Sequence, residues 1–291
     1  MPGHNIPQNI VTPLTNGPSE TKRNQAANLQ QYIQDLLGDT HHTFLQGSYR
    51  NHTAVSDLPD VDIVAMRSQT YSGIHSPYRG GKPTIMWSDI FSEIITKLRS
   101  QNKYSWQIEE KEKCIKLRGT INADIVPAVK FHHDHLVDPV AIRSWSSERL
   151  SHPRTHIANG EAKNTATNGN FKPTVRMFKN WVANHFGTSD VISSFKVEAL
   201  VHSADNSNFY DDPVLSFLAV GITINERLNP RIITQPIFSV CGSEDIIASW
   251  DASKRLQFYN QFNKSLQSAI AAYRATTVAD AERYWRIAFN L

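Results

Sequence analysis

The chain has 291 residues, of which 40% are hydrophobic and 20% are charged, and its net charge is +3. This is the composition of an ordinary soluble globular protein that can bury a full core. No apolar run is long enough to cross a bilayer and no secretory signal opens the chain, so we expect a cytoplasmic protein without membrane partners. The mild positive charge suits small anionic ligands such as nucleoside triphosphates better than a long polyanion.

Two cysteines, Cys114 and Cys241, lie far apart in the sequence. A zinc ribbon needs four soft ligands at close spacing, so two cysteines exclude that kind of site. A single disulfide is one alternative, but we expect two buried free thiols.

The first half of the chain predicts a mixed α/β domain over residues 19–158. Residues 1–18 are rich in Pro, Asn, Gly and Thr and are expected to form an extended tail. Ser19 has the side chain of an N-cap for a helix that ends before Gly38, and Ser88 is expected to cap a second helix. Strand-like segments cover residues 43–46, 61–66, 104–108, 114–117 and 121–131, and residues 67–82 are expected to form a loop.

The chain becomes mostly helical after about residue 140. Residues 159–170 are dense in Asn, Thr and Gly and predict a polar loop. Apolar residues at helical spacing predict helices over residues 173–185, 194–203, 213–225, 254–275 and 279–289. The predicted fold class is therefore α/β plus α, with residues 159–291 forming a helical second lobe.

The pair Gly47-Ser48 follows the first predicted strand. Glycine lets a backbone approach phosphate oxygens closely because it has no side chain, and Ser48 adds a hydroxyl donor. Such pairs are also common in turns, so the pair alone predicts little.

The sequence Asp60-Val61-Asp62 adds a stronger signal. Residues two apart on a strand point to the same face, so the two carboxylates lie side by side. Nearby like charges repel unless a cation neutralises them, and Mg²⁺ prefers a few carboxylates together with substrate phosphates. The alternative is that these acids are turn residues without a ligand.

Asp124 is a lone carboxylate in an apolar strand segment, where an unpaired charge would be costly. A metal ion is one expected partner, and Lys116 or Arg118 is the alternative. Two metal ions held by three aspartates match in-line displacement at phosphorus, with one activating the attacking hydroxyl and the other stabilising the departing pyrophosphate. We therefore predict a metal-dependent nucleotidyltransferase with Asp60, Asp62 and Asp124 as its catalytic metal ligands.

At these residues the chain resembles the polymerase-β superfamily, and within it the CD-NTases, relatives of cyclic GMP-AMP synthase and oligoadenylate synthetase. The resemblance covers residues 19–275. It implies a polymerase-β-like core and an oligoadenylate-synthetase-like helical lobe with the active site in the cleft between them. It also implies a bacterial anti-phage enzyme that binds ATP or another nucleoside triphosphate and makes a cyclic di- or trinucleotide second messenger. Two Mg²⁺ ions, replaceable by Mn²⁺, are the implied cofactors, and a downstream effector senses the product.

Two later segments carry the resemblance into the helical half. The stretch 171–181 resembles the helix that opens the second lobe, which makes Lys179 a triphosphate contact. The stretch 193–200 resembles the next helix start, where Ser194 would bind phosphate and Phe195 would stack on a base. Relatives often carry tyrosine at that position, so its hydroxyl hydrogen bond is absent here. An exposed lysine and a core phenylalanine are the alternatives.

Other functions share part of this pattern. A nucleotidyltransferase that modifies an antibiotic, a tRNA end or a protein would use the same three aspartates, and a non-catalytic nucleotide-binding regulator would keep only the fold. The chain lacks the cysteines of the zinc-bound insertion found in the animal DNA sensor, so we expect no activation by nucleic acid, and we expect a monomer. The histidines at 132, 133 and 135 are expected to form a solvated turn.

Overall fold

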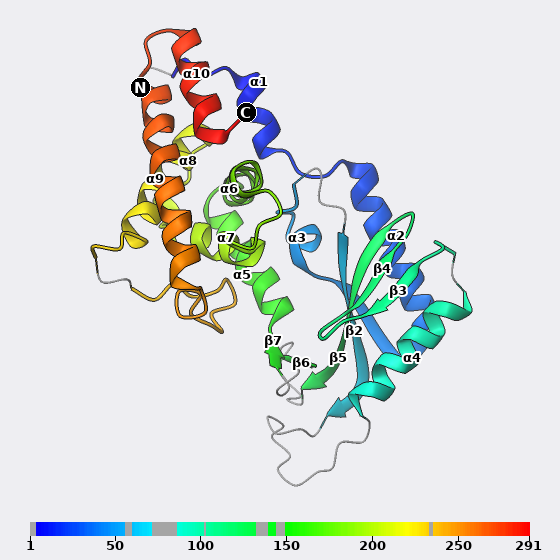
Figure 1. Cartoon of the computed structure of the whole chain (residues 1–291). Coiled ribbons are helices and arrows are strands. Elements are labelled where there is room, and N and C mark those ends of the chain that lie inside the picture. The colour runs from blue at the N-terminus through cyan, green and yellow to red at the C-terminus, as the bar shows by residue number, and fades with distance from the viewer. Residues whose placement is uncertain are drawn as a thin grey trace. The chain divides into compact units, whose positions relative to one another are not determined.

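The computed structural model describes residues 4–55, 60–71, 86–101, 103–131, 139–143, 149–232 and 235–291. The chain forms two compact units, one of residues 18–157 and one of residues 1–17 together with 158–291 (Figure 1). All strands of the sheet lie in the first unit, and the second is built from helices. The predicted fold class, α/β plus α, is confirmed.

A mixed sheet forms the first unit. Within the described residues its order is β1-β2-β5-β4-β3, with β2 and β5 parallel and the other pairs antiparallel. The long strand β5 pairs with β4 along its first half and with β6 along its second half, and β6 also pairs with β7. The strands are β1 (His41–Leu45), β2 (Asp60–Tyr71), β3 (Gln107–Glu110), β4 (Ile115–Arg118), β5 (Asn122–Phe131), β6 (Val140–Ile142) and β7 (Arg149–Ser151).

Helices α2 (Glu20–Leu37) and α4 (Trp87–Ser100) cover one face of this sheet (Figure 1). As predicted, the Ser19 hydroxyl caps α2 by accepting from the Lys22 N–H, and Gly38 ends it. The N-cap of α4 is Met86, so the prediction that Ser88 caps this helix is wrong. The apolar stripes of both helices pack against alternate strand residues: Val61, Ile63, Ala65, Ala123 and Ile125.

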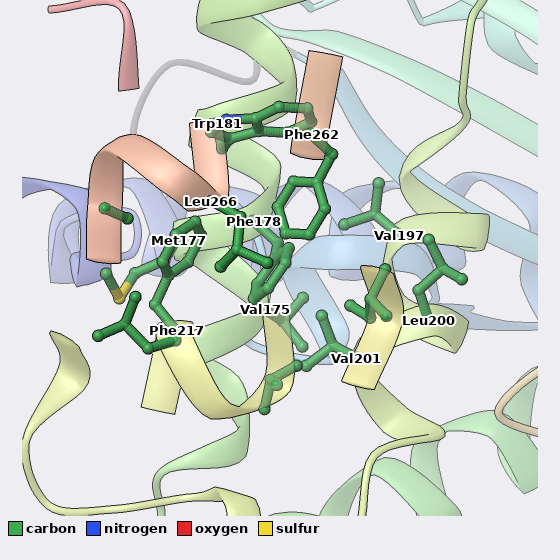
Figure 2. Close-up of a cluster of buried hydrophobic side chains, with 14 of the residues drawn as sticks. Val175, Met177, Phe178, Trp181, Val197, Leu200, Val201, Phe217, Phe262 and Leu266 are labelled. Carbon is green, nitrogen blue, oxygen red and sulfur yellow. The ribbon is translucent and has the colours of Figure 1, made fainter. Parts of the chain in front are cut away.

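The second unit packs its helices around an aromatic core (Figure 2). Trp181 lies edge-on to Phe262, with ring centroids 4.9 Å apart, and its indole N–H donates to the Ala288 carbonyl.

No helix among the described residues is both long and apolar enough to cross a membrane. The helices are α1 (Gln8–Thr15), α5 (Pro153–Ala166), α6 (Phe171–Phe186), α7 (Ser194–His202), α8 (Pro213–Arg227), α9 (Ala252–Arg274) and α10 (Val278–Phe289).

The prediction of an extended tail over residues 1–18 is wrong, because α1 lies there and belongs to the helical unit. Ile10, Val11 and Leu14 recur at helical spacing and are buried in its core. Asn180 of α6 donates to the Leu14 carbonyl at 2.9 Å and so fixes the end of α1. The Pro and Asn residues of this segment concealed the short apolar stripe.

The predicted loop over residues 159–170 is also wrong, since α5 continues to Ala166. Proline is favoured at the first helical position, and Pro153 begins this helix. Polar contacts replace an apolar stripe: Asn159 donates to the Val240 carbonyl at 2.8 Å and Lys163 to the Ala204 carbonyl at 2.5 Å. In the predicted loop over 67–82, β2 instead continues to Tyr71. Residues 72–82 and the predicted turn at histidines 132, 133 and 135 lie outside the described residues.

The buried His41 side chain predicts a pH-dependent stability. His41 is only 2% exposed to solvent. Burial lowers the pKa of His41 to about 4; the Glu93 charge opposes this shift, and the Arg67 and Lys97 charges add to it. In the unfolded chain the His41 imidazole has its ordinary pKa of about 6.5, so the unfolded state takes up the proton first as the pH falls. The stability contributed by neutral His41 is therefore complete above about pH 6.5 and is lost progressively towards pH 4.

We expect the free energy of unfolding to fall by about 1–3 kcal/mol more between pH 7 and pH 4.5 in the wild-type chain than in a His41→Gln variant. Urea denaturation at a series of pH values measures both slopes. His42 is exposed on the same strand, so His42→Gln is the matched control and should keep the wild-type slope. A His41→Gln slope equal to that of the wild type would contradict this assignment.

Candidate active site

Parallel pairing of β2 with β5 brings the predicted acids together. Asp62 is the register partner of Asp124, and Asp60 pairs with Asn122. Paired residues of adjacent strands point to the same face, and residues two apart on one strand do so as well. Because Val61, Ile63 and Ala123 face the helices α2 and α4, the three carboxylates lie on the opposite face of the sheet.

The Gly47-Ser48 loop folds directly against this acidic strand. Gly47 begins α3 (Gly47–Arg50), a single helical turn after β1, and the Gln46 N–H donates to the Asp62 carbonyl at 2.9 Å. Gly47 has φ +65°, and a Cβ added there would collide with the Asp62 carboxylate. Glycine is therefore required twice, for its backbone conformation and for the close approach. The Ser48 carbonyl accepts from the N–H groups of Thr53 and Ala54, both at 3.0 Å.

Two basic side chains of β4 reach the same face. Lys116 is the register partner of Asp124, and Arg118 follows two residues later. The Arg118 guanidinium spans two acids, with Nη2 3.1 Å from Asp60 Oδ2 and Nη1 3.2 Å from Asp124 Oδ1. Lys116 Nζ lies 3.9 Å from Asp124 Oδ2. Both basic partners that the sequence allowed for Asp124 are thus present.

These three carboxylates and two cations have a summed formal charge of −1. No three His, Cys, Asp or Glu side chains of the described segments are grouped as a ready-made metal site. The donor chemistry nevertheless fits a hard divalent cation, because carboxylate oxygens on adjacent strands are the ligands that Mg²⁺ prefers. The close backbone at Gly47 leaves no side chain between the loop and Asp62. Asp60, Asp62 and Asp124 are the residues that would hold such an ion.

Cys114 also lies at this site, although it was not among the predicted site residues. Its Sγ lies 3.9 Å from Asp124 Oδ2. Burial, followed by the neighbouring Asp124 charge, raises the pKa of the Cys114 thiol to about 11, so this side chain is neutral at physiological pH. Period-two spacing was the available signal, because Cys114, Lys116 and Arg118 alternate along the strand that pairs with Asp124. Cys114 and Cys241 are free thiols as predicted, although both are half-buried rather than buried.

Arg143, which follows β6, holds the turn that leads into Cys114 and β4. Its guanidinium binds the Glu110 carboxylate at 2.7 Å and the carbonyl oxygens of Lys111 and Glu112 at 2.6 and 2.7 Å. The same guanidinium lies over the Phe91 ring, with Cζ 3.5 Å from the ring centroid. This contact ties the turn to α4 and so to the sheet.

Lys179 lies on α6 of the helical unit and is buried, so the alternative of an exposed lysine is wrong. Its Nζ is 3.3 Å from Glu198 Oε2, and the two side chains are only 4% and 5% exposed. Glu198 was not predicted as a site residue, although a lone charge within the apolar stretch 197–201 was an available signal. The predicted triphosphate contact of Lys179 stays a prediction.

Ser194 and Phe195 open α7, where a helix start was predicted. Ser193 is the N-cap, and its hydroxyl accepts from the Lys196 N–H at 3.4 Å. Ser194 is exposed at the first helical position, whereas Phe195 is half-buried and packs against the core of the helical unit. Their predicted contacts with phosphate and base stay predictions.

Part of the chain is similar to known nucleotidyltransferases. Residues 158–268 match the family model of the cGAS/DncV-like nucleotidyltransferase C-terminal helical domain. The cyclic UMP-AMP synthase of Rhodothermus marinus is 28% identical over 185 residues, which cover 57% of this chain and 64% of that protein. The cyclic dipurine nucleotide synthase of Elizabethkingia meningoseptica is 30% identical over 189 residues, with the same 57% and 64% coverage.

A solved structure extends the similarity of the fold to nearly the whole chain. The Rhodothermus marinus synthase with bound nucleotide analogues has a TM-score of 0.73 at 19% identity, covering 94% of this chain and 99% of that one. The two units therefore have the fold of a nucleotidyltransferase with a helical C-terminal domain. These similarities support the resemblance to the CD-NTases that the sequence predicted, with the family model itself covering residues 158–268.

The close approach of Gly47 to Asp62 can be tested against a second glycine. Gly38 has nearly the same backbone angle, φ +64°, but nothing lies within 4 Å of an added Cβ. We expect Gly38→Ala to lower the free energy of unfolding by about 1–2 kcal/mol through backbone strain alone. Gly47→Ala should cost at least about 1 kcal/mol more, because Asp62 Cγ and Cβ also lie 3.1 and 3.3 Å from the added atom and rotating the carboxylate does not clear it. Urea denaturation measures both losses, and equal losses would contradict the predicted clash.

Proposed function

We propose that this protein joins nucleoside triphosphates into a cyclic oligonucleotide and releases pyrophosphate. The observation that carries the proposal is the pairing of Asp62 with Asp124 on one sheet face, with Asp60 beside them and the Gly47 backbone against Asp62. The relatives support it, since they are named as cyclic nucleotide synthases for different bases. The family resemblance further supports the proposal that the product is a second messenger of anti-phage defence. A downstream effector would sense it.

The acidic face would serve as the cation-binding part of the reaction. Asp60, Asp62 and Asp124 offer carboxylate oxygens to Mg²⁺. We propose that two Mg²⁺ ions bind here and that Mn²⁺ can replace them. When bound, these ions would activate the attacking hydroxyl and stabilise the departing pyrophosphate. The Gly47 backbone would come close to phosphate oxygens, and the Ser48 hydroxyl would donate to them.

Residues of the helical unit would bind the rest of the nucleotide. Ser194 is exposed at the N-terminus of α7, where the helix dipole favours an anion. Phe195, which is half-buried, offers part of its ring for stacking on a base. Lys179 would contact the triphosphate, and this requires exchange of its Glu198 partner for phosphate oxygens. These roles rest on the family resemblance and on the positions of the residues in their helices.

The product identifies the reaction. Incubation of the full chain with all four labelled nucleoside triphosphates and Mg²⁺ or Mn²⁺, followed by phosphatase, should leave a phosphatase-resistant cyclic species that mass spectrometry identifies. A linear product, or nucleoside monophosphate attached to an antibiotic, a tRNA end or a protein, would overturn the proposal of a cyclic product.

The double variant Asp60→Asn/Asp62→Asn is expected to abolish pyrophosphate release, because amide side chains remove the charge that binds the cations. The pair Asp35→Asn/Asp39→Asn is the matched control: both acids are exposed in the same unit, outside the acidic face, and release should be unchanged. Circular dichroism checks that both variants fold. Pyrophosphate release that persists in Asp60→Asn/Asp62→Asn would contradict the mechanism.

Variants of two adjacent serines test phosphate binding and helix capping independently. Ser194→Ala should raise the KM for nucleoside triphosphate about tenfold and leave the melting temperature nearly unchanged, since it removes a hydrogen bond to a charged group. Ser193→Ala should lower stability by about 1 kcal/mol through loss of the cap and leave KM unchanged. Steady-state kinetics and thermal melts on both variants distinguish the roles. An unchanged KM in Ser194→Ala would remove this residue from the proposed site.

A further inference from the structure

Arg118 lies between two of the three acids. Its two Nη atoms contact Asp60 Oδ2 and Asp124 Oδ1 at 3.1 and 3.2 Å, so one planar guanidinium ties β2 to β5 across the acidic face. The side chains of Arg118, Asp60 and Asp124 are 33%, 36% and 20% exposed, respectively, which leaves them open to exchange with ions from solvent.

This guanidinium is held more firmly than that of an ordinary surface ion pair. Its Nη1 also donates to the carbonyl oxygen of Leu117 at 3.0 Å, within its own strand. The fork geometry of arginine allows simultaneous contacts that the point charge of lysine cannot make. Lys116 Nζ lies 3.9 Å from Asp124 Oδ2, so its contact with the three acids is the weaker of the two.

Arg118 and a divalent cation require the same carboxylate oxygens. An ion on Asp60 and Asp124 would meet a guanidinium that already contacts these oxygens, and like charges at this distance repel. Without any cation, three carboxylates on adjacent strands would repel one another and weaken the β2–β5 pairing. One residue therefore has two opposite effects, stabilising the metal-free sheet and opposing the metal.

We propose that Arg118 is a resident counter-cation that holds the acids in place before the metal arrives and sets the affinity of the acidic face for divalent cations. This positioning role rests on the proposed function, because it assumes that the three aspartates bind metal. Binding of the metal requires Arg118 to release Asp60 and Asp124. Removal of Arg118 is therefore expected to strengthen metal binding. Removal of a residue that only supports the site would weaken it.

Mn²⁺ binding to the full chain without nucleotide tests this role, with the free ion measured by electron paramagnetic resonance. Arg118→Gln should lower the Kd for Mn²⁺ about tenfold, and in EDTA its melting temperature should fall below that of the wild type. Arg118→Lys retains the charge but cannot span both acids, so its Kd should lie between the two. Arg99→Gln is the matched control, because Arg99 is exposed in the same unit and away from the acids, and it should leave Kd unchanged.

The outcomes separate this inference from the proposed function. A wild-type chain that binds Mn²⁺ in an Asp60- and Asp62-dependent way, together with unchanged or weaker binding in the Arg118 variants, overturns the inference alone. Absence of such binding in both the wild-type chain and Arg118→Gln overturns the metal-dependent function and the inference with it. If Arg118→Gln does not fold, Arg118→Lys decides, because only competition predicts tighter Mn²⁺ binding in a variant with a lower melting temperature.

Discussion

Repulsion among three carboxylates on one sheet face is the interaction on which the site depends. It follows from the parallel pairing of β2 with β5, which sets Asp62 opposite Asp124 with Asp60 two residues away. Each neighbouring group either tolerates or balances the negative charge of these carboxylates. Gly47 brings an uncharged backbone against Asp62, Arg118 and Lys116 supply positive charge, and burial beside Asp124 keeps Cys114 protonated. A cluster of three carboxylates favours cations, and the proposed reaction uses that preference.

The sheet can carry this charge because its two faces are chemically separate. Alternation along β2 and β5 directs Val61, Ile63 and Ile125 towards α2 and α4, so the hydrophobic core lies on one side. The acids occupy the intervening positions and share their face with a smaller apolar cluster that includes Val64 and Ala128. A shift of β2 by one residue would bury two aspartates and expose the core residues, so the same pattern that stabilises the unit also fixes the register of the site.

The parts that could be predicted from sequence were those with a strong local signal. Period-two spacing placed Asp60 and Asp62 on one face, and Ser19 with Gly38 bounded α2 correctly. Helix α1 was missed because its apolar stripe is short, and α5 because it buries few apolar residues and relies on polar contacts. The bridge from Arg118 to Asp60 and the pair Lys179–Glu198 depend on which strands and helices become neighbours, and local spacing does not specify this.

The cationic side chains of the proposed site already have acidic partners within their own units. Arg118 is paired with Asp60 and Asp124, and Lys179 is paired with Glu198, each within its own unit. Breaking a buried pair without replacing the lost partner leaves an uncompensated charge and is strongly unfavourable. In the proposed function, phosphate oxygens at Lys179 would therefore deprive the buried Glu198 carboxylate of this lysine, whereas Arg118 and its two acids are partly exposed and can exchange partners with ions from solvent. Opening the Lys179–Glu198 pair is the more costly of the two exchanges, because both of its side chains are nearly buried.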